Sequence, residues 1–400
     1  MSRRILVTGA SVAGSTAAWW LTHFGFEVDV VEKASVFRTG GQNVDVRGAA
    51  RDVLRRMGLE PAAFARNTPE RGTEWVDEQN RTIARFDAGS SGSDNAPTAE
   101  LEIRRGDIAQ LIYDATRERA SYRFGDSIRA VLQDTGGADV TFASGRRERY
   151  DIVVVAEGVG SATRELLFPG ENRPRWMDLT IAYFSIPRQS HDTDYARVYN
   201  TVGGRGATLK PSRDALLGAY VGIHKKTDGE QEWDPTRQRQ YMLDLFANDG
   251  WEFPRILEVM KDVDDFYFDV LRQVRMDRWS DRRVVLTGDA AWCPTPLSGI
   301  GTTLAMVGGY VLAGELSSQG SLPVALARYE EVMRPFVKEG QNIPKIIPRM
   351  LWPHSPTGLR LMHSAMRVAG KPLARKAFSI TFSRNSSKII LPNYKTSREP

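Results

Sequence analysis

The first residues that could do chemistry lie in a glycine-containing turn near the N-terminus. The apolar segment 5–7 precedes the turn and predicts a buried parallel strand, and an Ala- and Trp-rich helical segment follows it. Backbone N–H groups at the start of such a helix, together with the positive end of its dipole, bind an anion. We therefore expect a pyrophosphate to contact the turn residues, which are Gly9, Ser11, Val12, Ala13 and Gly14.

A carboxylate follows at the position where such a site holds a ribose. A second apolar strand, residues 28–31, is followed by Glu32 and Lys33, about twenty residues after the glycines. Ser11 replaces the middle glycine of the usual G-x-G-x-x-G pattern, but its side chain is small and its hydroxyl can bond a phosphate. Strand, turn, helix, strand and acidic residue together predict a dinucleotide site.

A second segment repeats the order of strand, turn and helix. The apolar strand 283–286 leads to Gly288 and Asp289, and a proline-containing loop then leads to a helix predicted from Thr302. The carboxylate would accept hydrogen bonds from ribityl hydroxyls, and N–H groups at the helix start would face the negative charge of a reduced flavin ring. Taken alone, the segment is also compatible with an ordinary turn. The loop residues assigned to this site are Pro296, Leu297, Gly299, Ile300 and Gly301.

With both segments in place, the chain resembles the FAD-dependent aromatic monooxygenases, the class A flavoproteins with the para-hydroxybenzoate hydroxylase fold. The resemblance covers nearly the whole chain, and the tetracycline-inactivating and polyketide-hydroxylating branches are the most similar. The family's "R-x-x-L" element is matched by Arg105 with Ile108. Its "A-D-G…S…R" element is matched by Ala156, Gly158, Ser161 and Arg164. The resemblance implies that Arg105, Gly158 and Arg164 lie at the bound FAD.

Two residues depart from the family pattern. Glu157 stands where the second of these elements has Asp, and Trp292 stands where His is frequent. The first leaves the contacts to the nicotinamide cofactor or the flavin open, and the second is expected to change the loop beside the flavin ring. Neither removes the predicted FAD site.

The resemblance implies a flavin-dependent hydroxylation. NAD(P)H reduces FAD, O₂ adds to give a C4a-hydroperoxide, and the distal oxygen passes to an electron-rich carbon of a phenolic or polycyclic substrate, such as a polyketide or a tetracycline. No side chain is assigned as a nucleophile, because the cofactor performs the chemistry. Two alternatives stay open: a flavin oxidase or dehydrogenase on the same fold, and a flavin- or ligand-binding protein without turnover.

The middle third of the chain predicts an antiparallel sheet with one face on a pocket. Its short, aromatic and alternating segments are residues 179–187, 195–201, 206–210 and 215–224. A packing role for Tyr183 and Tyr220, and a position in a solvated turn for Arg205, are open alternatives to substrate contact. The candidate substrate contacts are Tyr183, Arg205, Tyr220, Pro296 and Leu297. Asp45 and Arg47, in the glycine-rich passage 38–48, are expected to reach the flavin or the pocket.

The predicted fold is therefore α/β: a Rossmann-like FAD-binding domain with an inserted antiparallel-sheet substrate domain and a C-terminal helical segment. The FAD-binding domain is discontinuous and comprises residues 1–72, 100–170 and 276–320. The substrate domain comprises a hairpin, 73–99, and the sheet, 171–275. Residues 321–400 form a C-terminal part with a long bridging helix, 328–347, and a basic tail.

The overall composition excludes several other classes of protein. With 41% hydrophobic and 26% charged residues, the 400-residue chain is an ordinary globular protein, and its net charge of +5 does not indicate nucleic-acid binding. The longest apolar stretch, 302–314, is too short to span a bilayer. A secretory signal peptide is disfavoured because Gly9 and Gly14 interrupt the apolar run. The single cysteine, Cys293, fits a reducing cytoplasm and is expected to pack rather than react.

The expected partners are accordingly small molecules. They are an aromatic substrate, FAD and NAD(P)H, bound by a monomer or a homodimer. Five scattered histidines show no ligand spacing, so no metal site is predicted. The basic cluster near the C-terminus is interpreted as a solvated tail and consists of Lys371, Arg375, Lys376, Arg384 and Lys388.

Overall fold

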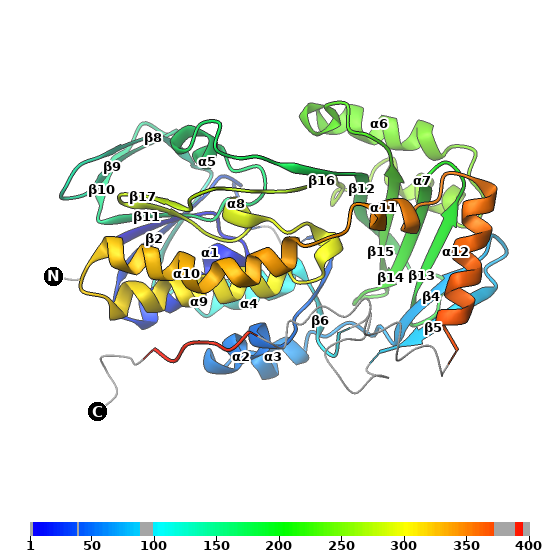
Figure 1. The fold of residues 1–400 in the computed structure, drawn as a ribbon, viewed down its shortest axis with the longest axis horizontal. Coiled ribbons are helices and arrows are strands. Elements are labelled where there is room, and N and C mark those ends of the chain that lie inside the picture. Colours follow the sequence, from blue (N-terminus) through cyan, green and yellow to red (C-terminus); the bar gives the residue numbers. More distant parts are fainter. Residues whose placement is uncertain (1–2, 38–39, 89–98, 372–388, 395–400) are drawn as a thin grey trace.

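Two sheets of different type organise the fold (Figure 1). The structure is a computed structural model and describes residues 3–37, 40–88, 99–371 and 389–394. The first sheet has six strands in the order β17-β18-β11-β1-β2-β7, and the second has seven in the order β16-β12-β15-β14-β13-β4-β5. They occupy opposite halves of the molecule.

The first sheet is parallel except at one edge, where β17 runs antiparallel to β18. Its central strands are continuous apolar runs that are buried on both faces, as parallel strands covered by helices are. Because these strands run in one direction, their carboxyl ends meet at a single edge of the sheet. The strands are β1 (Arg4–Thr8), β2 (Glu27–Glu32), β7 (Ser121–Phe124), β11 (Ile152–Val155), β17 (Ser280–Asp281) and β18 (Val284–Leu286).

Helices cover the first sheet and share one hydrophobic core with it. The helices α1 and α9 pack closely, since a Cβ at Gly309 of α9 would lie 2.8 Å from the backbone nitrogen of Ala17. The helices of this half are α1 (Val12–His23), α2 (Ala49–Arg56), α3 (Glu60–Phe64), α4 (Arg105–Asp114), α5 (Ala162–Leu167), α8 (Asp289–Trp292), α9 (Gly301–Ser318) and α10 (Leu322–Gln341).

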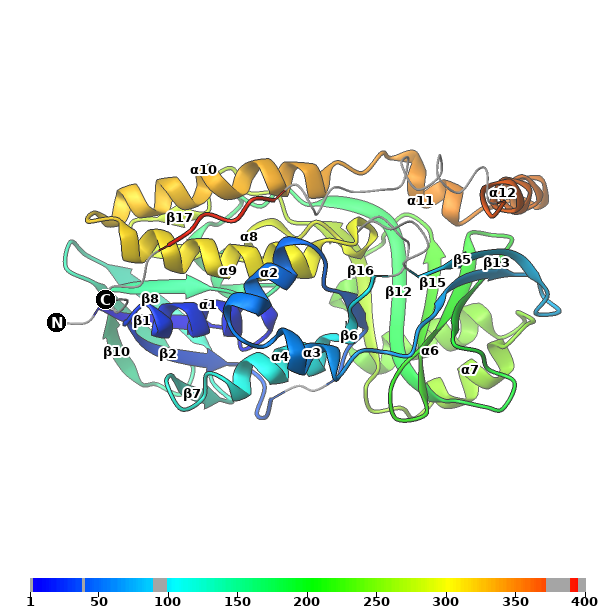
Figure 2. The same ribbon diagram turned by 90° about the horizontal axis from the view of Figure 1, so that it is seen from below.

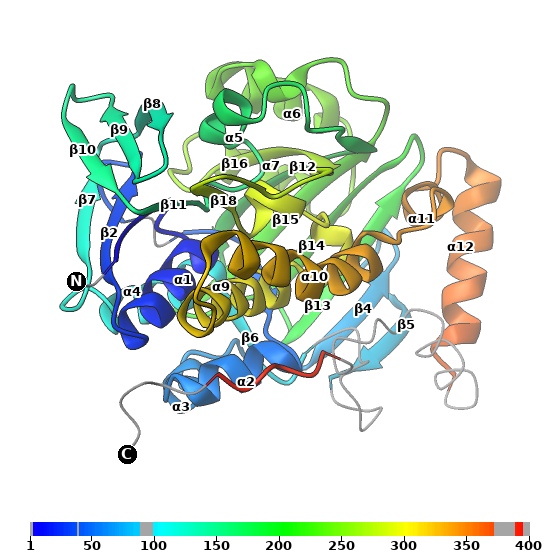
Figure 3. The ribbon, with the colours of Figure 1, turned by 60° about the vertical axis from the view of Figure 1, so that its left-hand side comes forward.

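Two small sheets complete this half. The three-stranded sheet of β8 (Ile128–Gln133), β9 (Ala138–Phe142) and β10 (Arg147–Tyr150) lies at the end farthest from the second large sheet (Figures 1 and 3). The strands β3 (Asn43–Asp45) and β6 (Glu102–Arg104) form an antiparallel pair that lies where the two halves meet (Figure 2).

The second large sheet is antiparallel except where β13 pairs with β4. One face packs on α6 (Pro235–Phe246) and α7 (Phe253–Met260), while α11 (Ile346–Leu351) and α12 (Pro356–Ala369) lie on the opposite side (Figure 2). A 3-10 turn, Glu230–Glu232, precedes α6. The strands are β4 (Gly72–Val76), β5 (Thr82–Asp87), β12 (Arg175–Pro187), β13 (Tyr195–Thr201), β14 (Arg205–Pro211), β15 (Leu216–His224) and β16 (Tyr267–Gln273).

The predicted fold class is confirmed, with one correction among the helices. The expected bridging helix 328–347 is wrong in its bounds, because α10 begins at Leu322 and ends at Gln341, and α11 is separate. Pro344 explains the break, since a proline restricts the residue before it to extended backbone and removes an N–H donor. The helix α12 was not predicted. The domain boundaries stay a prediction.

Two expectations concern the remainder of the chain. Within the residues that the structure describes, no helix is both long and apolar enough to cross a bilayer. In the basic cluster, Lys371 is exposed, whereas Arg375, Lys376, Arg384 and Lys388 lie outside the described residues.

Candidate active site

The turn after β1 is built by close backbone packing. Gly9 has φ +100°, and a Cβ there would lie 2.5 Å from the carbonyl oxygen of Ala156. A Cβ at Gly14 would overlap the carbonyl oxygen of Gly9, so the first turn of α1 can approach β1 only without a side chain. The N-terminus of α1 therefore points its N–H groups into a small cavity of about 100 Å³, which Ser11, Val12 and Ala13 help to line.

Glu32 and Arg105 lie at the same cavity. The carboxylate of Glu32 accepts hydrogen bonds from the backbone N–H groups of Ala10 and Ala34, both at 2.9 Å. Arg105, the first residue of α4, donates from Nη2 to the Ser11 hydroxyl at 3.0 Å. The serine that replaces the middle glycine thus positions a guanidinium over the helix start, where an anion would bind. Arg105 lines both this cavity and the larger one described below.

The second glycine-bearing turn lies across from the first. Gly288 has φ +60° and is the N-cap of α8, which presents Asp289 to both cavities. Burial raises the pKa of the Asp289 carboxyl, while nearby Arg105 and a hydrogen bond from the Cys293 thiol lower it. The loop continues through Thr295, a non-glycine residue with φ +74°, to Gly299 with φ +67°, two residues before α9.

The two turns open onto adjoining cavities. The larger cavity, of about 560 Å³, is lined by Pro296, Leu297 and Gly299 on one side and by the second sheet on the other. The two cavities share six wall residues, which are Arg105, Glu157, Gly158, Asp289, Gly301 and Thr302. An elongated molecule could therefore lie along both turns at once.

A row of three tyrosines forms the opposite wall of the larger cavity. Tyr183 of β12 is paired in register with Tyr220 of β15 and with Tyr267 of β16. Their ring centroids are 5.0 Å and 6.1 Å from that of Tyr183, and all three residues line the cavity. Burial raises the pKa of each hydroxyl, so the three side chains stay neutral phenols that can donate hydrogen bonds. Tyr267 was not among the sequence-based candidates.

One end of the tyrosine row contacts a buried group of charges. The Tyr220 hydroxyl accepts a hydrogen bond from the backbone N–H of Asn43 at 2.8 Å. Beside it, the ammonium of Lys210 contacts the Glu102 carboxyl and forms an ion pair with Glu70 at 3.3 Å. Burial, with the neighbouring carboxylates, raises the pKa of Glu102 to about 8. Burial lowers the pKa of Lys210, but the surrounding acidic groups outweigh it and hold that pKa above its ordinary value. The cavity wall therefore carries a lysine that stays charged and a carboxyl that keeps its proton at neutral pH.

The other end of the row carries a second acid. Asp269 lies on β16 two residues after Tyr267 and lines the larger cavity. Burial and the charge of Asp289 raise the pKa of Asp269 to about 6, against the attraction of Arg272 and Arg105. Lys210 and Asp269 were missed from the sequence, because each is a single residue on a strand and only the pairing of distant strands brings it to the cavity.

Several predicted site residues lie behind the cavity walls instead of lining them. Arg164 is buried and donates to the carbonyl oxygens of Ala290 and Val159, so it supports the backbone beside Asp289. Arg47 pairs with Asp45, which itself lines the larger cavity. Arg47 and Arg164 therefore support the cavity walls, and their direct contact with a ligand stays a prediction.

Arg205, a candidate substrate contact, lies outside both cavities. Its guanidinium forms an ion pair with Asp249 at 3.0 Å and donates to the carbonyl oxygen of Leu245, so it is directed toward α6 and not into either cavity. Lys33 is exposed and also lies outside the two walls. Gly288 packs on Ala13, and Ile300 packs near Gly340, so both residues shape the second turn without lining either cavity.

The two departures from the family pattern have structural explanations. The Glu157 carboxylate accepts four hydrogen bonds, from the hydroxyls of Thr8, Ser161 and Thr163 and from the Thr163 backbone N–H, at 2.6–3.0 Å. It thereby ties the start of α5 to β1 at the shared wall.

Trp292 turns into the protein core. Its ring centroid lies 4.6 Å from that of Trp279 and 6.0 Å from that of Tyr329, and the residue is 1% exposed. Trp292 therefore affects the loop expected beside the flavin ring by packing behind it. Cys293 lines the larger cavity, and burial raises the pKa of its thiol, which disfavours a nucleophilic thiolate.

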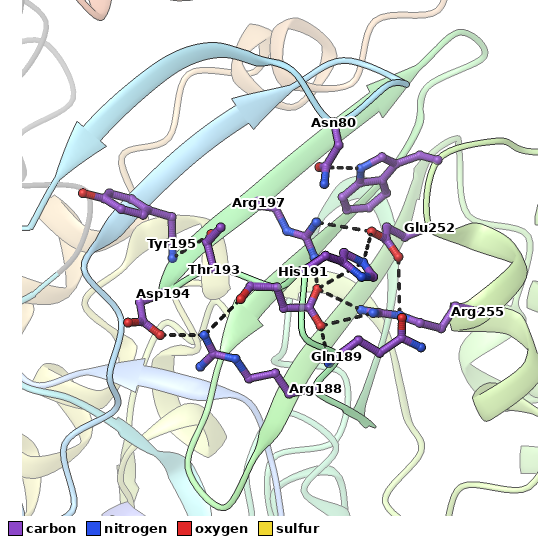
Figure 4. Close-up of polar contacts among 12 residues, drawn as sticks. Asn80, Arg188, Gln189, His191, Thr193, Asp194, Tyr195, Arg197, Glu252 and Arg255 are labelled. Carbon is purple, nitrogen blue, oxygen red and sulfur yellow. Dashed lines mark hydrogen bonds and ion pairs between the residues drawn. The ribbon is translucent and has the colours of Figure 1, made fainter.

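A separate cluster of ionisable groups lies on the second sheet (Figure 4). Ligand atoms of His191, Asp192 and Glu252 lie within 4.8 Å of one another. Arg197 forms ion pairs with both carboxylates, and Arg255 adds a third pair to Asp192 at 3.1 Å. The acidic groups are thus compensated by two arginines, which tie the loop before β13 to α7.

The fold and the two glycine-bearing turns define an FAD-binding protein. A family model described as "FAD binding domain" matches residues 3–339, and the chain belongs to this family of FAD-dependent monooxygenases. A "Flavin-dependent monooxygenase" from an unknown prokaryotic organism is 33% identical over 343 residues, which are 85% of this chain and 88% of that protein.

Two further similarities extend over almost the full length. "Flavin-dependent monooxygenase eupH" from Phoma sp. is 32% identical, and the alignment covers 98% of both chains. Among solved structures, tetracycline destructase Tet(55) is 29% identical, with a TM-score of 0.82 over 98% of this chain and 99% of that one. The protein is therefore an FAD-dependent monooxygenase.

The residues at the two cavities fit FAD. Because Gly9 and Gly14 have no side chain, the turn packs closely and the N–H groups of α1 stay open to a pyrophosphate. Arg105 supplies a positive charge at the shared wall, and Asp289 supplies an acceptor for hydroxyl groups. The side-chain oxygen of Gln42, in the wall of the larger cavity, is buried and lacks a hydrogen-bond donor among the described residues, as expected of a group that a ligand satisfies.

Proposed function

We propose that the protein uses NAD(P)H and O₂ to hydroxylate a phenolic or enolic polycyclic substrate in the 560 Å³ cavity. The main support is the arrangement of that cavity, which has the tyrosine row on one wall and the cofactor turn from Pro296 to Gly301 on the other. A planar, fused-ring substrate matches a space bounded by aromatic rings and a short apolar loop. The tetracycline destructase similarity supports the same substrate class.

The assignment of the cofactor contacts is part of this proposal. The N–H groups of Val12 and Ala13, with Arg105, bind the pyrophosphate, and Glu32 accepts a hydrogen bond from the ribose. Asp289 accepts hydrogen bonds from the ribityl chain. The N–H groups at the start of α9, from Gly301 onward, face the ring and stabilise negative charge on it.

The substrate contacts follow from the opposite wall. Tyr183 and Tyr220 donate hydrogen bonds to substrate oxygens, and Pro296 and Leu297 pack against the edge of the substrate. Bound FAD supplies the electrons taken from NAD(P)H and the activation of O₂. The chain keeps the substrate over the ring and excludes water, for which the apolar wall residues Ile181, Leu271 and Trp352 are suited.

Oxygen incorporation tests this proposal. The holoenzyme is mixed with NADH or NADPH, isotopically labelled O₂ and a panel of polycyclic phenols, and products are analysed by mass spectrometry. We expect a substrate-dependent increase in NAD(P)H oxidation and one labelled oxygen atom in the product. Hydrogen peroxide with unlabelled product would indicate an oxidase, and bound FAD that NAD(P)H never reduces would indicate a binding protein.

A further inference from the structure

The charges of this chain are segregated along the sequence. Residues 340–398 contain eleven Lys or Arg and no Asp or Glu. Since the whole chain has a net charge of +5, the remaining residues carry a net charge of −6. The acid-free segment includes α11 and α12 but none of the proposed cofactor contacts, so binding of an anionic cofactor does not explain it.

The same segment concentrates exposed apolar side chains. Of the ten large hydrophobic residues that are exposed in the described part of the chain, five lie in it. Four of these are on the two helices, each directly after a basic residue. The pairs are Lys345-Ile346 at the N-terminal end of α11, Arg349-Met350 on α11, and Arg360-Leu361 and Arg367-Val368 on α12.

The helix α12 has two apolar faces, although the sheet covers only one. Met366 and Ala369 are buried against Ala84 and Phe86 of β5. On the other side, Leu361 and Val368, seven positions apart and therefore on one stripe, are 71% and 57% exposed. A helix that only covers a sheet needs no second apolar stripe.

The basic residues beside this stripe have no acidic partner in the part of the chain that the structure describes. Most arginines elsewhere form ion pairs, such as Arg104 with Asp107 and Arg149 with Asp134. In contrast, no ion pair between a carboxylate and Lys345, Arg349, Arg360 or Arg367 occurs among the described residues. An apolar stripe flanked by uncompensated cations is the composition of helices that lie in the headgroup region of an anionic bilayer.

We propose that the exposed faces of α11 and α12 dock on an anionic lipid surface. The apolar side chains enter the boundary between headgroups and acyl chains, and the basic side chains contact the lipid phosphates. The junction of the two helices carries Trp352, whose side chain lines the larger cavity. Asn200 donates to the Leu351 carbonyl oxygen at 2.9 Å and fixes this junction to β13, so docking would place the cavity wall near the lipid. This inference is independent of the proposed substrate.

Vesicle binding tests the docking surface. The FAD-loaded full chain is centrifuged with vesicles of phosphatidylcholine alone or mixed with phosphatidylglycerol. We expect binding only to the mixed vesicles, weakened by salt. The double variant Leu361→Ser/Val368→Ser should bind about tenfold or more weakly, and Arg360→Gln/Arg367→Gln should lose about fivefold per charge.

Leu132→Ser is the matched control. Leu132 is 74% exposed on β8, at the opposite end of the molecule (Figure 1), and its replacement should leave vesicle binding unchanged. Unchanged flavin absorbance and unfolding temperature verify that each variant is folded. The proposal is overturned by absence of binding to mixed vesicles, or by binding that survives loss of both apolar residues. It is also overturned if light scattering shows a dimer that Leu361→Ser/Val368→Ser converts to a monomer, because a second copy then covers this face.

Discussion

The two walls of the larger cavity are built in different ways. On the side of the first sheet, the backbone makes the wall. It consists of glycines with positive φ, free N–H groups at helix starts, and the loop around the 3-10 turn Pro296–Ser298. On the side of the second sheet, side chains make the wall, namely the tyrosine row, Lys210 and Asp269. The backbone wall admits no side chain at its closest contacts, whereas the side-chain wall can be altered one group at a time.

This difference separates the wall that must stay constant, which we assign to the cofactor, from the wall that can vary, which we assign to the substrate. A wall of backbone N–H groups suits a ligand that is always the same, because any added atom closes it. A wall of side chains on regular strands suits a variable ligand, because the strands keep their pairing when the side chains change. Substitutions on the backbone wall should therefore remove the cofactor, and substitutions on the side-chain wall should change stability and substrate use but leave the cofactor bound.

The largest expected effect is at Gly14. In Gly14→Val the new Cβ would overlap the Gly9 carbonyl oxygen, which should cost about 3 kcal/mol or more of folding free energy and yield colourless protein. Flavin absorbance of the purified variant and its thermal unfolding measure both effects. Gly320→Val is the control, since a Cβ there meets no atom within 4 Å. A normal flavin spectrum in Gly14→Val would contradict the claim that the backbone wall tolerates no added side chain.

Asp289 is the one side chain on which we expect FAD retention to depend strongly. In Asp289→Asn, loss of a charged acceptor should weaken FAD binding by about 1.5–3 kcal/mol, which is roughly ten- to hundredfold in Kd. Fluorescence titration of apoprotein with FAD measures this change. Asp262→Asn, at an exposed position, should bind FAD normally. Equal retention in both variants would remove Asp289 from the cofactor site.

On the side-chain wall, Glu102 should make stability depend on pH. Between the ordinary carboxyl pKa of 4.5 and about 8, folded Glu102 keeps a proton that the unfolded chain releases. The folded state therefore binds more protons, and the free energy of unfolding falls as pH rises, by up to about 1.4 kcal/mol per pH unit.

Glu102→Gln should flatten this fall without loss of FAD. Urea unfolding at several pH values between 5 and 8 measures the slope. The control is Glu100→Gln, whose side chain is 71% exposed and should leave the slope unchanged. A slope in Glu102→Gln equal to that of the wild type would contradict the assignment of the proton to Glu102.

The smallest effect distinguishes two tyrosines of the same row. Tyr220→Phe removes the acceptor of the Asn43 N–H and should cost about 1–2 kcal/mol of stability. Tyr183→Phe should cost less, because the Tyr183 hydroxyl has no hydrogen-bond partner within the described residues. If both tyrosines contact the substrate, each variant should raise KM while FAD stays bound. Loss of flavin from either variant would mean that the two walls are not independent.

The same contrast explains how far the sequence could be interpreted. A wall built by backbone can be recognised in the sequence, because its glycines must lie directly between the strand and the helix that they join. Gly9, Gly14, Asp289 and Gly299 could therefore be assigned to one ligand site. The tyrosines at 183 and 220 were candidates only because they lie on alternating segments.

The rest could not be predicted, because it depends on which strands become neighbours. Lys210 meets Glu70 and Glu102 only after β14 lies next to the β3–β6 pair, and no local pattern shows this. The position of Arg205 outside the cavities could not be predicted for the same reason, since its partner Asp249 follows a helix that begins thirty residues later. The core-facing orientation of Trp292 could not be predicted either, because its partners Trp279 and Tyr329 come from separate elements.

The shared wall between the two cavities draws its six residues from three distant stretches of the chain, around positions 105, 157 and 289–302. During synthesis, the ribosome must release slightly more than three quarters of the polypeptide before the last of these can join the others. Yellow colour would then report that a nascent molecule has completed its assembly, and truncated translation products would remain colourless.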